Sequence, residues 1–202
     1  MTRLRSGRGR QDRSKGQSLV EFALVFPMFF ILFLGLIEFA FAFNAILGVN
    51  FASRNAALAA AEAGTSSGAD CVTLKGIEED VTAPANRANI IKVEVYRAKS
   101  NGDPYDTTTK TVWTRGTPTP CTLPDGTATS VPYTRTNNSY PEASRCNILA
   151  GCPGPGLHTS IDHIGVRIFY DHPYVTPLET FVGTGSGITF DRSNVMRMEP
   201  IL

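Results

Sequence analysis

The sequence lacks the motifs that carry the commonest nucleotide-dependent and hydrolytic reactions. It contains no G-x-x-x-x-G-K-[S/T] phosphate-binding loop, no H-E-x-x-H metal motif and no G-x-S-x-G elbow that follows a strand. The glycine-rich stretch 183–187 has no lysine and does not precede a clear helix. These absences argue against a nucleotide hydrolase, a metalloprotease and a serine hydrolase. We therefore expect a protein that is not an enzyme and uses no cofactor or metal.

Charge is nearly absent between Phe22 and Phe43. Glu38 is the single charged residue in this run, and Pro27 is its single helix breaker. A helix over these positions is roughly 33 Å long, which is enough to cross a hydrocarbon core of about 30 Å. We therefore expect a transmembrane helix over residues 17–43, with Glu38 exposed near its outer end.

The residues before this run are strongly basic. Six basic residues and one acidic residue give segment 1–16 a net charge of +5. Basic residues beside a spanning helix remain on the cytoplasmic side. We therefore expect a cytoplasmic leader over 1–16 and an extracytoplasmic domain over 44–202. With 13 basic and 15 acidic residues, that domain gives no indication of nucleic-acid binding.

The junction between leader and apolar run reads G-Q-S-L-V-E-F-A-L-V-F-P over residues 16–27. A short basic leader that ends in glycine, before an apolar helix with glutamate at its fifth position, resembles the type IV prepilin class. The finer pattern resembles the TadE-like minor pilins, or pseudopilins, of tight-adherence (Flp) pilus systems. Further similar features are residues 36–39, the alanine-rich stretch 50–63 and residues 196–200. The resemblance is dense over 16–63 and thin beyond it.

The resemblance implies that a prepilin peptidase cleaves between Gly16 and Gln17, because a residue without a Cβ fits a narrow peptidase site. It also implies that Glu21 and Phe22 take part in assembly, with Glu21 neutralising the new amino group of Gln17. The implied partners are the peptidase, companion pilins, an inner-membrane platform and a secretion ATPase. The implied role is to support assembly of an adhesive pilus from the bacterial inner membrane. Whether the protein enters the filament is left open.

Three other interpretations remain open. Glu21 can serve, together with or in place of its assembly role, as the capping-box partner of Ser18 in a helix that begins near that residue. Residues 40–42 match the small-x-small pattern of a cleaved secretory signal, although the apolar run exceeds the usual 7–15 residues. The chain can also be an uncleaved, signal-anchored binding domain that does not assemble into a filament.

All four cysteines follow the apolar run. An even number of cysteines in an exported domain predicts two disulfides, for which three pairings are possible. We expect the pairs Cys71–Cys121 and Cys146–Cys152. A metal site is disfavoured because Cys146 and Cys152 lack the C-x-x-C spacing of zinc sites.

The extracytoplasmic part alternates apolar and polar residues in several short segments. We expect a short helix over 74–81 and strands over 91–96, 111–114, 161–170, 188–190 and 195–198. Ile91, Val93 and Val95 are expected on one buried face. Residues 116–160 contain seven of the thirteen prolines and three of the four cysteines, and are expected to form a surface loop. The fold class is α+β, with one long helix on an antiparallel sheet of about four strands.

The helix is expected to continue beyond the membrane with two apolar stripes. A stripe of mostly small residues is expected to receive a second helix, and a stripe of larger residues to face the chain's own sheet. The small stripe comprises Ile46, Val49, Ser53, Ala56, Ala57 and Ala60, and the large stripe comprises Leu47, Phe51 and Leu58.

His158, Asp162, His163 and His172 lie close together in the sequence. A zinc site or an acid–base pair would need them to converge, but neighbouring residues of a strand point to opposite faces. We expect surface or strand-edge histidines.

Overall fold

The computed structural model describes residues 12–149, 151–152, 158, 160–177, 180 and 187–199. The chain divides into two compact units. One contains the chain up to Ala40 together with segment 174–186, and the other contains Phe41–Pro173 and the chain from Gly187 onward. Most of the expected leader and of the glycine-rich stretch 183–187 lies outside the described residues.

Helix α1 runs from Asp12 to Ala63 and remains continuous across Pro27. It begins six residues before Ser18, so the expected capping role of Ser18 is wrong. It ends at Ala63, and Gly64 follows with φ +58°. Among the described residues, α1 is the one helix long and apolar enough to span a membrane, which is consistent with a single-pass membrane protein.

The second unit contains a five-stranded antiparallel sheet, one strand more than expected. Its strands are β1 (Ile90–Ala98), β2 (Lys110–Thr122), β3 (Ala128–Asn138), β4 (His163–Pro173) and β5 (Gly187–Arg197). Their order in the sheet is β3-β2-β1-β4-β5. The two short strands expected after residue 187 are the single strand β5. The α+β class is confirmed.

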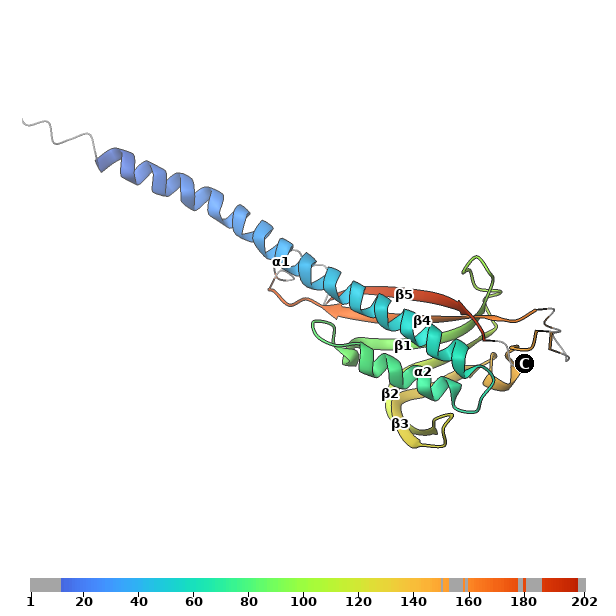
Figure 1. Cartoon of the computed structure of the whole chain (residues 1–202). Coiled ribbons are helices and arrows are strands. Elements are labelled where there is room, and N and C mark those ends of the chain that lie inside the picture. The colour runs from blue at the N-terminus through green and yellow to red at the C-terminus, as the bar shows by residue number, and fades with distance from the viewer. Residues whose placement is uncertain are drawn as a thin grey trace, which may run out of the picture. The chain divides into compact units, whose positions relative to one another are not determined.

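The outer half of α1 and helix α2 (Ala69–Asp80) lie on one face of this sheet (Figure 1). The sheet contributes Val93 and Val95 of β1 and the alternating residues Ile164, Val166 and Ile168 of β4 to the core between them. Short 3-10 turns occur at Arg87–Asn89 and Glu142–Ser144. The core therefore lies between two helices and one side of the sheet.

One residue of the expected buried face points the wrong way. Ile91 is 42% exposed, whereas Ile90 is buried. The pairing of β1 with β4 shifts register between Ile90 and Lys92. This β-bulge inserts one residue and reverses the alternation before it, which the simple alternating pattern did not reveal.

Much of segment 116–160 is strand rather than the expected loop. β2 continues to Thr122 and β3 pairs with it, although Pro118, Pro120 and Pro132 lie within these strands. β1 pairs with β2 only as far as Thr114, and β3 is an edge strand. Prolines are tolerated there because no second neighbour needs their missing N–H groups.

Candidate functional site

The expected cleavage point lies on the exposed surface of α1. Gly16 and Gln17 are both exposed, and a Cβ placed on Gly16 would meet no atom within 4 Å. The bond between them lies inside the helix, four residues after its start at Asp12. The surface at Gly16 and Gln17 is therefore accessible, while the backbone between them is held in helical form.

Glu21 is exposed one turn after Gln17. The Gln17 side chain donates a hydrogen bond from Nε2 to Glu21 Oε1 at 3.0 Å. Phe22 is 66% exposed, and its ring packs on that of Phe26 at 5.3 Å between centroids. The structure therefore brings together Gly16, Gln17 and Glu21 on one stretch of helix, as an i to i+4 geometry requires.

Glu38 is buried, contrary to the expected interfacial exposure. Its side chain accepts hydrogen bonds from the backbone N–H groups of Val175 (3.0 Å) and Thr176 (2.9 Å) and from the Thr176 hydroxyl (2.8 Å). Only 3% of Glu38 is exposed. A buried carboxylate needs such donors, and here the chain itself supplies them. The sequence offered one signal, because Thr176-Pro177 is typical of a turn with free N–H groups.

Replacing Glu38 with alanine is expected to release segment 174–177 from α1. Hydrogen bonds to a charged acceptor contribute about 1.5–3 kcal/mol, so amide exchange at Val175 and Thr176 should become about 10–100 times faster. Hydrogen–deuterium exchange of the full chain in detergent micelles measures this change. Glu62→Ala, at an exposed position of the same helix, is the matched control. Equal exchange in the parent and the Glu38 variant would show that the contact does not hold the segment.

The small stripe of α1, and not the large stripe, packs against the chain's own sheet, which is the reverse of the expectation. Val49, Ser53, Ala56, Ala57 and Ala60 of the small stripe are buried in the chain's own core. Leu47, Phe51 and Leu58 of the large stripe are 50%, 58% and 45% exposed. Small side chains let the helix backbone approach the sheet closely, which leaves the larger side chains on the outside.

Both expected disulfides are present. Cys71–Cys121 joins α2 to the end of β2, with Cα atoms 6.0 Å apart, and Cys146–Cys152 closes a short loop at 5.5 Å. Gly68 (φ +91°) lies so close to Thr122 that a Cβ would be 2.0 Å from the carbonyl oxygen. This glycine allows the start of α2 to reach the strand that carries Cys121.

His158 and Asp162 belong to a hydrogen-bond network that ties several segments together. His158 Nδ1 lies 2.7 Å from Asp162 Oδ1, but buried Asp162 also accepts hydrogen bonds from Arg97 Nε at 2.9 Å and Tyr140 Oη at 2.9 Å. Burial first, and then the Asp162 charge, raise the pKa of Tyr140 well above its usual value. His172 lies near the end of β4 and is buried, so it is not at the surface. Asp162 is therefore a structural centre that joins β1, β4 and the loop before β4.

Other chemistry is not supported within the described part of the chain. No group of three or more His, Cys, Asp or Glu side chains there is placed to hold a metal ion. Residues 64–68 read G-T-S-S-G, the spacing of a nucleophile elbow, but they connect α1 to α2. A nucleophile elbow connects a strand to a helix, so this match has a different structural setting.

Comparison with known proteins places one segment of the chain beside a known family. No curated protein and no solved structure matches the chain. A family model described as TadE-like protein matches residues 16–58, a segment that lies entirely within α1 and contains Gly16, Glu21, Glu38 and the large stripe. The resemblance inferred from the sequence is thus confirmed over residues 16–58, where this chain is similar to the TadE-like proteins.

Proposed function

We propose that this chain is a TadE-like minor pilin or pseudopilin that supports assembly of an adhesive tight-adherence pilus. The observation that carries the proposal is the surface of α1 within the family match. Exposed large apolar side chains recur along it from Leu19 to Leu58, beyond the length that a bilayer core of about 30 Å would cover. Exposed apolar surface of this extent is typical of an interaction site.

The proposed orientation places the N-terminus in the cytoplasm and the sheet outside. The net charge of +5 over 1–16 favours retention of that end inside. Both disulfides belong to the second unit, and disulfides persist on the oxidising side of the membrane. These two observations are independent and favour the same topology in the bacterial inner membrane.

Processing after Gly16 gives this residue two roles. It offers the peptidase a position without a side chain, and it weakens the helix at the bond to be cut. Glycine in a helix interior is unfavourable by about 1 kcal/mol relative to alanine, which lowers the free energy of local unwinding. The partners proposed are the prepilin peptidase, companion pilins, the inner-membrane platform and the secretion ATPase.

Gly16→Val is expected to block leader removal and to leave membrane insertion intact. The added branched side chain obstructs the peptidase site and stiffens the helix, while the apolar run is unchanged. N-terminal sequencing of the protein from membranes should give Gln17 for the parent and the uncut N-terminus for the variant. Gly35→Val, at a position of the same helix where a Cβ would also meet no atom within 4 Å, is the matched control and should still be cut.

A parent protein that retains its leader would contradict this proposal. It would favour an uncleaved, signal-anchored binding domain that does not assemble. A mature N-terminus near Phe43 would instead favour a secretory signal.

A further inference from the structure

A small cavity lies on the sheet face opposite the helices. Its volume is about 120 Å³, which is room for about four water molecules at roughly 30 Å³ each. Glu94 and Tyr96 of β1, Lys110 of β2 and Arg167 of β4 line it, together with the connection between β1 and β2. Charged side chains from three adjacent strands therefore converge there.

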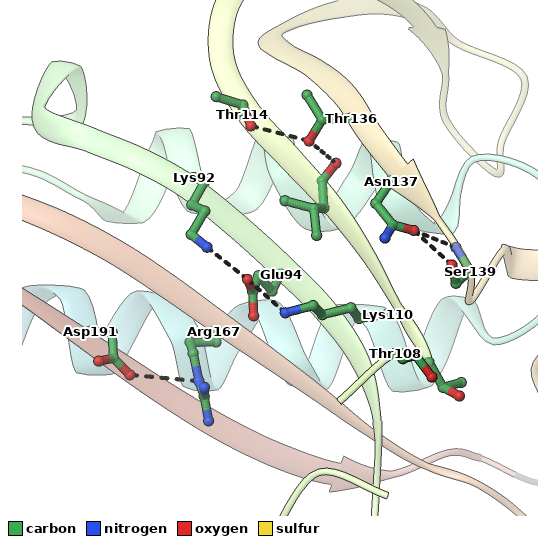
Figure 2. Close-up of polar contacts among 12 residues, drawn as sticks. Lys92, Glu94, Thr108, Lys110, Thr114, Thr136, Asn137, Ser139, Arg167 and Asp191 are labelled. Carbon is green, nitrogen blue, oxygen red and sulfur yellow. Dashed lines mark hydrogen bonds and ion pairs between the residues drawn. The ribbon is translucent and has the colours of Figure 1, made fainter. Parts of the chain in front are cut away.

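The carboxylates in this cavity already have their hydrogen-bond donors. Buried Glu94 accepts from Lys92 Nζ at 2.9 Å and from Lys110 Nζ at 3.1 Å, one on each side of it (Figure 2). Burial raises the pKa of Glu94, but the hydrogen bonds and charges of the two lysines together lower it by more, so the net shift is downward. Hydrogen bonds from Thr109 and Thr108 likewise hold the pKa of Asp106 well below its usual range. Both groups are ionised and paired, so a second cation would find little to bind.

The hydrogen-bond donors that line the cavity have fewer partners than its carboxylates do. Tyr96 is 3% exposed, and its hydroxyl has no hydrogen-bond partner in the described part of the chain. The Nε atom of Arg167 forms no hydrogen bond to any described residue, and it lies 3.6 Å from Asp191 Oδ2 in a loose ion pair (Figure 2). A guanidinium carries five N–H donors in a planar fork. The unmet requirement of this cavity is therefore for hydrogen-bond acceptors.

The backbone beneath Tyr96 fixes its position. Tyr96 pairs with Gly165 across β1 and β4, and a Cβ on Gly165 would lie 2.3 Å from the Tyr96 ring. The absent side chain lets the ring lie flat against β4, where Arg167 stands 5.5 Å from the ring centroid. The phenol and the guanidinium are thus held side by side before any ligand arrives.

We propose that this cavity binds a carboxylate group, either of a small free acid or of an acidic side chain on a partner polypeptide. Planar guanidinium groups pair with both oxygens of a carboxylate, and a tyrosine hydroxyl can donate to one of them. The volume fits a carboxylate with one or two attached carbons.

Titration of the full chain in detergent micelles tests this proposal. The probes are acetate and N-acetyl-glutamate methylamide, each added at constant ionic strength against chloride, with N-acetyl-glutamine methylamide as the neutral match. The amide NMR signals of Gly165 and Arg167 should shift and saturate, with a Kd of about 1–10 mM for such small ligands. Saturation with acetate supports a free acid, and saturation with the glutamate probe alone supports an acidic side chain.

Three variants separate binding from folding. Arg167→Lys and Tyr96→Phe should each weaken binding about tenfold. Tyr96→Phe should also leave the thermal midpoint of the unliganded protein equal or higher, because it removes a buried hydroxyl without a partner. Arg192→Lys, on the opposite face of the sheet, should bind like the parent. Shifts that chloride reproduces, or that both cavity variants retain, would overturn the proposal and leave a cavity that holds only water.

Discussion

Glu21→Gln is expected to abolish association with companion pilins and surface piliation, with insertion, protein level and leader removal close to normal. The substitution keeps the shape of the side chain and part of its hydrogen bonding, but it removes the charge. In this structure Glu21 is exposed, and Gln17 bonds to it at 3.0 Å. After cleavage, the residue that already contacts Glu21 would carry the new amino group.

The size of the effect follows from the setting of the charge. A helix-terminal carboxylate in water contributes at most about 1 kcal/mol, which a long membrane helix would barely register. An unpaired charge within lipid costs several times more, and a subunit's amino group removes that cost only when subunits associate. The loss should therefore appear in assembly and not in insertion.

Co-purification of companion pilins and counts of surface pili measure this result. Glu38→Gln is the matched comparison, because it makes the same change on the same helix. Glu38 takes its donors from Val175 and Thr176 of its own chain, so its replacement should loosen that segment and reduce assembly far less. Normal piliation in the Glu21 variant would show that Glu21 is not an assembly residue.

Removal of the Cys71–Cys121 disulfide is expected to destabilise the second unit by about 4 kcal/mol, and removal of Cys146–Cys152 by about 2 kcal/mol. The difference comes from the loops that the bonds close, because the two cysteines are 50 residues apart in one pair and 6 in the other. A longer loop removes more conformational entropy from the unfolded chain. Loss of the first bond also frees the end of β2, which has β3 but not β1 beside it.

Paired cysteine-to-alanine variants of the full chain allow this comparison in guanidinium chloride with maltoside micelles. Trp113 is the single tryptophan and lines a cavity together with Cys71 and Cys121, so its emission reports unfolding there. Thiol labelling of the denatured, unreduced parent is the control for oxidation. Four reactive thiols would refute both disulfides, and equal losses from the two pairs would refute the loop-length explanation.

The sequence predicted those features that depend on local pattern. The continuation of α1 beyond the apolar run and the strand character of β1 and β4 are confirmed, since each depends on periodicity or apolar length. The two expected cysteine pairs are also confirmed, although the sequence left three pairings possible. The prolines of β2 and β3 misled the prediction, because their tolerance depends on which strand edge lacks a neighbour. That information is a property of the assembled sheet.

The candidate site was predicted only where its residues are neighbours in the chain. Gly16, Gln17 and Glu21 lie within six positions, and a helix brings them together automatically. The partners of Glu38 are about 137 residues away, so no local pattern could connect them. The prediction for the two stripes of α1 was wrong for a similar reason. Side-chain size alone did not indicate which stripe would pack against the sheet.

The centre of the sheet pairs β1 with β4, and the ribosome synthesises these two strands far apart in time. β1 pairs on one side with β4, where Val93 meets Ile168 across 75 positions of sequence. A chain that emerges from its N-terminus can form the β1–β2–β3 meander early, but one edge of β1 stays open until β4 follows. Open edges and uncovered apolar faces invite pairing with other chains, and contacts so distant in sequence form slowly. The domain is therefore expected to be most prone to aggregation during the interval between completion of β3 and arrival of β4.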